Sequence, residues 1–221
     1  TYNLVGQITG KTETLFDGTA NQFVYGYDEK SRLVSVSKNN VEAERYEYDA
    51  NGNRLKHSVL ARGISEQVTS YNIGDQLQSS GSTQFEYDDN GRLSKKTNGT
   101  AIEDYTYSSQ GRLLTVKFLI DSILDKTISY QHSALGNRVA KLVDGVVSEK
   151  YLWLNKTTLA AIYDKDDNLV QRFEYGLGQT PISFTQSGNN YYISSDQIGT
   201  PRVITDDNGT VVKAIDYDTF G

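Results

Sequence analysis

The 221-residue sequence contains no cysteine and no methionine, and it has only two prolines and one tryptophan. Without cysteine the chain has no disulfides, no thiolate metal ligands and no cysteine nucleophile, and this composition suits either redox compartment. Because methionine is missing, Thr1 is not a natural start, and we expect the chain to be a piece of a longer protein. The scarcity of proline leaves long runs of backbone free to form β-ladders.

Basic clusters and long apolar runs are also scarce. The net charge is −6, and no run of Lys and Arg exceeds the pair Lys95 and Lys96. A nucleic-acid groove needs a basic stripe, so we expect no nucleic-acid partner. No window approaches 18 apolar residues, so we expect no membrane span. The two histidines, His57 and His132, form no recognisable Ser-His-Asp arrangement, and we predict no catalytic residues, no cofactor and no metal.

Tyrosine and glycine are abundant, with 16 and 19 residues, and many of them lie in a repeated phrase. The phrase reads aromatic, any residue, Tyr, Asp, two or three turn residues, Gly, Arg, Leu. Copies occupy residues 25–33, 46–55, 85–93 and 105–113, with weaker copies at 71–77, 130–139 and 163–169. The motif residues are Tyr25, Tyr27, Asp28, Arg32, Tyr46, Tyr48, Asp49, Gly52, Arg54, Phe85, Tyr87, Asp88, Gly91, Arg92, Tyr105, Tyr107, Gly111 and Arg112. A loose period of about 20 residues indicates a repeat architecture.

Each copy predicts a strand, a turn and a returning strand. Tyr46 and Tyr48 are two residues apart, so a strand places both rings on one face. Asp49 suits an Asx-turn that caps the following N–H groups. The Asn-Gly pairs at 51–52 and 90–91 are strong hairpin signals, because both residue types accept a positive φ. No convincing helix is present, and we expect 123–128 to be extended.

Hairpins of similar length laid side by side predict an all-β fold. We expect repeat-built antiparallel hairpins that form one long curved or spiralling sheet. The repeat arginines at 32, 54, 92, 112 and 138 are expected to pair with a carboxylate of a neighbouring repeat and to lie over a Tyr ring. We expect one repeat-built domain, 1–221, with the repeat hairpins in 1–140 and further hairpins in 141–221.

Two acidic segments resemble known ligand loops and are interpreted as turns. Asp164, Asp166 and Asn168 have the first spacings of a calcium loop, but its required Gly and Glu are replaced by Leu and Tyr. The segment 194–200 resembles the aspartate box of sialidase propellers, but its Gly comes one residue late. Asp and Asn favour turns, so both segments predict hairpin tips.

The phrase resembles the tyrosine-aspartate (YD) repeat of Rhs proteins, of the C components of insecticidal Tc toxins and of teneurins. Residues 191–221 resemble the start of the Rhs-associated core. The matching positions are Tyr192, Asp196, Gly199, Thr200, Pro201, Arg202, Thr205, Asp206, Gly209, Tyr217, Phe220 and Gly221. The family often has His where Ser194 and Gln197 stand, and Pro where Thr219 stands, so no role of those histidines carries over.

The resemblance implies a segment of a hollow β-shell that encapsulates a C-terminal polypeptide, often a toxin. In that family, aspartates of a later segment release the polypeptide, and this chain stops before that segment. The implied partners are the rest of a longer chain and the enclosed cargo, with a capping subunit or a cell-surface glycan as further candidates. The implied location is secreted or cell-surface, and the implied role is not enzymatic. A carbohydrate- or receptor-binding adhesion module is the alternative.

Overall fold

The structure, a computed structural model, describes residues 1–15, 17–196 and 198–220. Twenty β-strands and one short 3₁₀-helix, Leu60–Arg62, make up its regular structure, with no α-helix among these residues. The predicted all-β fold is confirmed, and residues 123–128 lie in a strand, β12 (Ile123–His132). No helix of the described part is long and apolar enough to cross a membrane. The chain divides into two compact units, Thr1–Glu86 and Tyr87–Gly221.

In the first unit each strand pairs antiparallel with the next strand along the chain. The strands are β1 (Gly10–Thr14), β2 (Ala20–Tyr27), β3 (Leu33–Lys38), β4 (Val41–Tyr48), β5 (Arg54–Val59), β6 (Ile64–Tyr71), β7 (Leu77–Ser80) and β8 (Thr83–Tyr87). Such sequential pairing follows from the hairpin signals of the sequence, because short loops join antiparallel neighbours.

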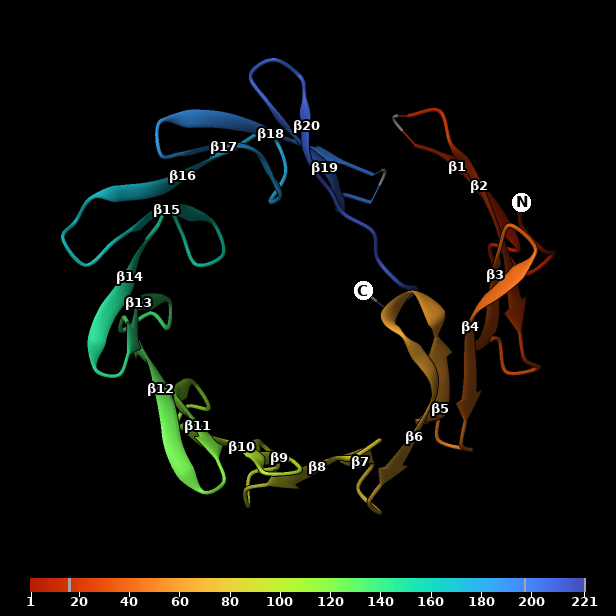
Figure 1. Cartoon of the computed structure of the whole chain (residues 1–221), viewed down its shortest axis with the longest axis horizontal. Coiled ribbons are helices and arrows are strands. Elements are labelled where there is room, and N and C mark those ends of the chain that lie inside the picture. The colour runs from red at the N-terminus through yellow and green to blue at the C-terminus, as the bar shows by residue number, and fades with distance from the viewer. Residues whose placement is uncertain (16, 197, 221) are drawn as a thin grey trace. The chain divides into compact units, whose positions relative to one another are not determined.

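The second unit repeats this organisation from β9 to β20, and Figure 1 shows its strands following one another in chain order from yellow-green to blue. The strands are β9 (Leu93–Asn98), β10 (Ala101–Tyr107), β11 (Leu113–Ile120), β12, β13 (Arg138–Val143), β14 (Val146–Trp153), β15 (Leu159–Tyr163), β16 (Leu169–Tyr175), β17 (Pro181–Gln186), β18 (Asn189–Ser195), β19 (Pro201–Asp206) and β20 (Val211–Ala214).

One kind of turn joins strands through two residues that both have positive φ. Asn39 and Asn40 join β3 to β4 with φ of 52° and 66°, and Asp144 with Gly145 joins β13 to β14 in the same way. This is the type I′ geometry, whose twist matches that of the flanking strands. The Asn39 side chain also accepts the backbone N–H of Gln22 at 2.8 Å, so the turn is tied to a third strand.

The tightly buried hydrophobic residues are few. Val36, Tyr46 and Val59 are 2–3% exposed in the first unit, and Val116, Ala140 and Ala161 are 3–6% exposed in the second. A single layer of strands cannot enclose a large core, so most tyrosines remain half-buried with their hydroxyls free to bind neighbouring groups. The contacts that join one hairpin to the next therefore contribute much of the stability of the fold.

Candidate functional site

The second kind of turn carries the repeated phrase, and Asp88 illustrates it. Its backbone N–H donates to the carbonyl of Arg92, and the N–H of Gly91 donates to the carbonyl of Asp88, with an N···O distance of 2.8 Å in both bonds. Its Oδ1 accepts the N–H groups of Asn90 and Arg92, each at 2.9 Å, as an Asx-turn does. Gly91 has a φ of 76°. The loop is a type I turn closed by a left-handed residue, followed by a bulge.

Eleven turns of the described chain share these two backbone hydrogen bonds, including one that begins at Leu15, and we call the ten that begin with Asn, Asp or Ser YD turns. Their first residues are Asn3, Asp28, Asp49, Asn72, Asp88, Ser108, Ser133, Asp164, Asp196 and Asp206. The fourth residue has a positive φ in every case. Gly52 and Gly91 have positive φ, as their Asn-Gly pairs favour, but Asn51 and Asn90 are not among the residues with positive φ, so neither pair forms a type I′ turn. The Asp side chain accepts the N–H groups on either side of the left-handed residue, and this favours the three-residue loop over the two-residue type I′ turn.

The arginine that follows a YD turn binds both its own turn and the next one. Arg32 donates from Nε and Nη2 to Oδ2 of Asp28, each over 2.7 Å, and from Nη1 to the carbonyl of Asp49 over 2.6 Å. Its guanidinium lies 4.8 Å from the centroid of the Tyr48 ring. The predicted ring contact is therefore present, but the expected ion pair to a neighbouring repeat is wrong. The carboxylate belongs to the same turn, and only the main-chain contact crosses to the next hairpin.

Arg92 repeats this arrangement with Asp88, with the carbonyl of Ser108 at 3.0 Å and with the ring of Tyr107 at 5.0 Å. Arg112 also reaches the next turn, at the carbonyl of Ser133 over 3.1 Å. The same bridge thus recurs along successive hairpins.

Arg54 and Arg138 do not occupy this bridging position, because their turns contain one more residue before the arginine. Asn53 takes the place of the bridging arginine, and its Nδ2 donates to Asp49 over 2.9 Å and to Asp75 of the next turn over 2.6 Å. Arg54 instead stacks within its own hairpin, 5.6 Å from the Tyr46 ring. Arg138 lies 4.1 Å from the ring of Tyr130 in the same way.

The tyrosine that precedes a YD turn binds the hairpin before it. The hydroxyl of Tyr48 donates to the carbonyl of Leu33 over 2.7 Å, and Leu33 is the first residue of the returning strand in the preceding hairpin. The same contact recurs at equivalent acceptors from Tyr27, Tyr107, Tyr175 and Tyr217. Trp153 occupies a tyrosine position, and its Nε1 donates to the carbonyl of Arg138 over 2.7 Å. The sequence reading missed Trp153, although its spacing of 21 residues from His132 is a signal of the period.

The first aromatic of the phrase binds within its own strand. Tyr46 donates to Glu44 over 2.6 Å, and Tyr105 donates to Glu103 in the same manner. Burial, and then the hydrogen bond to Glu103, raise the pKa of Tyr105. Burial opposes ionisation of Glu103, but hydrogen bonds from Tyr105 and from Lys96 at 3.0 Å leave its pKa below the usual value. Phe85 and Tyr25 hold the corresponding places in β8 and β2.

The acidic segments form ordinary YD turns. Oδ1 of Asp164 accepts the N–H groups of Asp166 and Asn168, each at 2.9 Å, and Oδ1 of Asp196 does the same within 194–200. The predicted hairpin tips are therefore confirmed. The described residues contain no cluster of three or more His, Cys, Asp or Glu suited to a metal ion.

The segment that resembles the Rhs-associated core continues the same pattern through the last strands. Tyr217 donates to the carbonyl of Pro201 over 3.0 Å, and Arg202 pairs with Asp216 at 3.3 Å. Tyr192 binds Asp207 at 3.1 Å. YD turns begin at Asp196 and Asp206 and place Gly199 and Gly209 at positive φ. Thr200 directly precedes β19, and Thr205 is the last residue but one of that strand. The backbone N–H of Phe220 donates to the side chain of Asp218. Gln197 and Gly221 lie outside the described residues.

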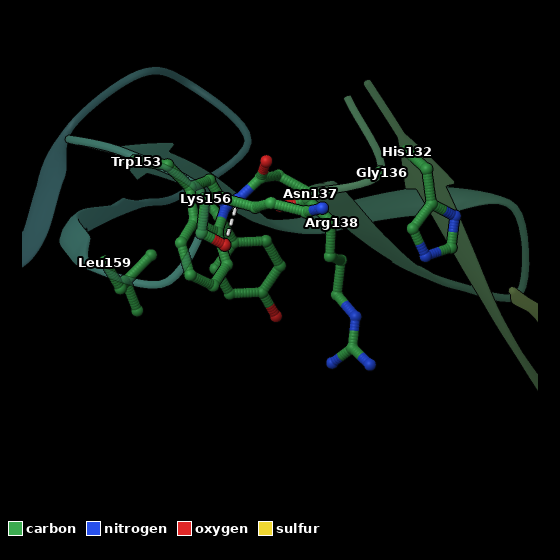
Figure 2. A pocket seen from close by; sticks show the side chains of 8 residues that line it. His132, Gly136, Asn137, Arg138, Trp153, Lys156 and Leu159 are labelled. Carbon is green, nitrogen blue, oxygen red and sulfur yellow. Dashed lines mark hydrogen bonds between the residues drawn. The ribbon is translucent and has the colours of Figure 1, made fainter. Parts of the chain in front are cut away.

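His132 fills a tyrosine position at the end of β12, opposite Arg138. It is half-buried, and burial together with the charges of Arg112 and Arg138 lowers its pKa. Asn137 follows it in the turn and donates from Nδ2 to the carbonyl of Lys156 over 3.0 Å (Figure 2). These residues form one side of a cavity in the second unit.

The family model of the teneurin YD-shell matches residues 1–221. Teneurin-1 of Gallus gallus is 28% identical over 93% of this chain, and teneurin-3 of Danio rerio is 29% identical over the whole of this chain. The tRNA3(Ser)-specific nuclease WapA of Bacillus spizizenii is 26% identical over 88% of the chain. This chain spans only 7–8% of the length of these relatives.

Among solved structures, the crystal structure of TcdB2-TccC3-TEV is similar over 93% of this chain and 15% of that chain, with 11% identity and a TM-score of 0.41. The match to the family model includes all ten YD turns. The chain belongs to the teneurin YD-shell family.

Proposed function

We propose that this chain is a segment of a β-shell wall that encloses a polypeptide cargo and has no enzymatic activity. One observation carries the proposal: the bridging arginine and the second tyrosine of the repeated phrase bind the neighbouring hairpins. Tyr48 and Arg32 illustrate this, because their contacts across hairpins end on main-chain carbonyls. Carbonyl acceptors are present at every residue, so such bridges tolerate sequence change and extend a wall hairpin by hairpin.

The names of the relatives support a structural role. Teneurins and a protein named as a nuclease share this segment, although it is less than a tenth of each. Because the segment occurs both in teneurins and in a protein named as a nuclease, we infer that its role does not depend on nuclease chemistry. We propose that the partners are the rest of a longer chain and the enclosed polypeptide, and that the location is secreted or cell-surface.

Protease protection tests the proposal in the parent protein that contains this segment. The polypeptide that follows the shell should resist a protease in the intact protein and become sensitive when Arg32 and Arg92 are both changed to Ala. Arg45→Ala is the matched control, because its side chain is 63% exposed and its ion pair with Glu42 lies at the surface. Circular dichroism checks that strand content is retained. Equal protease sensitivity of the enclosed polypeptide in the intact protein and in the double variant would contradict the proposal.

A further inference from the structure

A cavity of about 460 Å³ lies in the second unit, between the YD turn of Ser133 and the loop that follows β14. Figure 2 shows Trp153, Lys156 and Leu159 at one end, His132 at the other, and Arg138 between them. This volume lies in the range of about 300–1,000 Å³ in which proteins hold small molecules. The chain has one tryptophan, and it lies in this cavity.

The charged groups of the cavity are cationic, although the whole chain has a net charge of −6. Arg138 and Lys156 line it, and Arg112 lies against the backbone of Gly136 on its wall. None of these three cations forms an ion pair with a carboxylate within the described parts of the chain. Glu149 is near, but it already binds Lys141 at 2.7 Å and the hydroxyl of Tyr151.

The apolar and amide groups of the cavity are held in place. The indole of Trp153 is fixed by its 2.7 Å hydrogen bond to the carbonyl of Arg138, and the amide of Asn137 is fixed by the carbonyl of Lys156 at 3.0 Å. Nδ1 of His132 is buried and has no hydrogen-bond partner among the described residues. Such a site is arranged before a ligand arrives, which reduces the ordering cost of binding.

We propose that this cavity binds a small ring compound that carries a carboxylate group. The guanidinium of Arg138 and the ammonium of Lys156 suit the carboxylate, because charge-assisted hydrogen bonds to cations are strong and directional. The faces of Trp153 and Tyr151, with Leu159, suit the flat body of the ring. No acidic side chain lines the cavity, so the anion meets no like charge.

A bound carboxylate has a second consequence at His132. The cations around it disfavour its protonated form, and an anion placed among them opposes that effect. Binding should therefore raise the pKa of His132, which gives a readout independent of tryptophan fluorescence.

Fluorescence titration of Trp153 tests the proposal with four probes. Glucuronate and 4-hydroxyphenylacetate represent a sugar acid and an aromatic acid, and their neutral methyl esters are the matched controls. We expect at least one acid to change the fluorescence in a saturable way and its ester to bind at least about 10-fold more weakly, the factor expected for one lost charged hydrogen bond. Binding of only one acid shows whether the natural ligand is a sugar acid or an aromatic acid. Binding of one acid and binding of both acids each support the proposal.

Two variants assign the binding to the cavity. Arg138→Gln should weaken the acid at least about 10-fold, while Arg172→Gln should leave it unchanged, because Arg172 is 62% exposed and does not line the cavity. If Arg138→Gln does not fold, Lys156→Gln replaces it, since Lys156 is exposed and lines the cavity. Proton NMR of His132 should show its pKa rising with the acid. Absence of saturable binding, equal binding of acid and ester, or equal affinity of Arg138→Gln and Arg172→Gln would overturn the proposal.

Discussion

The hydroxyl of Tyr107 donates a 2.9 Å hydrogen bond to the carbonyl oxygen of Leu93, the residue that begins the returning strand of the preceding hairpin. Loss of this bond in Tyr107→Phe should reduce the free energy of unfolding by about 1 kcal/mol, because a part-buried carbonyl loses its donor. Urea denaturation measures the change. Tyr192→Phe is the control, since that tyrosine is 47% exposed and binds a surface carboxylate. A larger effect of Tyr192→Phe would show that the bridge to Leu93 contributes little.

Arg92 should be more sensitive to replacement by lysine than an exposed arginine. Its guanidinium binds Asp88, the carbonyl of Ser108 and the ring of Tyr107 at once, and a lysine ammonium cannot make these contacts together. We expect Arg92→Lys to lower the free energy of unfolding by about 1–2 kcal/mol. Arg45→Lys should change it by less than about 0.5 kcal/mol. Thermal melts of both variants check this, and similar melting shifts would argue against a fixed bridge.

The carboxylates of the YD turns predict that the chain loses stability at acid pH. Backbone hydrogen bonds from Arg92, and then its side chain, hold the pKa of Asp88 below the usual value, and Asp28 is held in the same way by Arg32. A lowered pKa in the folded state stabilises the fold above the unfolded pKa of about 4, and this stability is lost as the pH falls toward the folded pKa.

Urea midpoints between pH 6 and pH 3 measure this loss. The double variant Asp28→Asn and Asp88→Asn should start from a lower midpoint at pH 6 and lose less between about pH 4 and pH 3. An unchanged slope in the variant would mean that other carboxylates, such as Glu103, govern the acid response.

A side chain at the fourth residue of a YD turn should lower the stability of the fold, because that residue has a positive φ. Gly111 has a φ of 78° and open space around its Cα, so Gly111→Ala tests backbone strain without a clash. We expect a loss of about 1–2 kcal/mol in the free energy of unfolding. Gly178→Ala, at a glycine outside the left-handed region, should change it by less than about 0.5 kcal/mol. Conversely, Ser31→Gly should leave stability equal or higher, because Ser31 already has a φ of 67°. A loss for Ser31→Gly as large as that for Gly111→Ala would contradict this explanation.

The strands and their order follow from the sequence because each copy of the phrase contains both the alternation of a strand and the residues of its turn. The type of turn did not follow from the Asn-Gly pairs alone. In 49–53 the carboxylate of Asp49 accepts the N–H of Asn53 at 2.8 Å, and this long-reaching contact closes a three-residue loop. Local turn preferences describe the two central residues and do not include such a side chain.

The contacts between hairpins were less predictable than the hairpins. Aligning the copies by their arginines placed Arg54 with Arg92, whereas in the structure Asn53 is the residue equivalent to Arg92. The bridging position is fixed by its distance from the first residue of the turn, and the turn before Arg54 contains one more residue. Trp153 was not recognised as a member of the tyrosine series, because the sequence pattern does not show that an indole N–H can donate to the carbonyl equivalent to the one a tyrosine hydroxyl binds. The cavity beside it depends on side chains from four consecutive segments, which no local pattern reveals.

The hydrogen bond from each tyrosine to the preceding hairpin has a consequence for how such proteins change length. Within a unit, each of these tyrosine bridges joins a hairpin to its immediate neighbour and ends on a main-chain carbonyl, so it requires no particular side chain in that neighbour. Duplication or loss of one whole hairpin then leaves every remaining bridge with an equivalent acceptor. A cut inside a YD turn removes an acceptor and a donor together. We therefore expect natural variation in length to occur in steps of complete hairpins, with breakpoints at the two-residue turns.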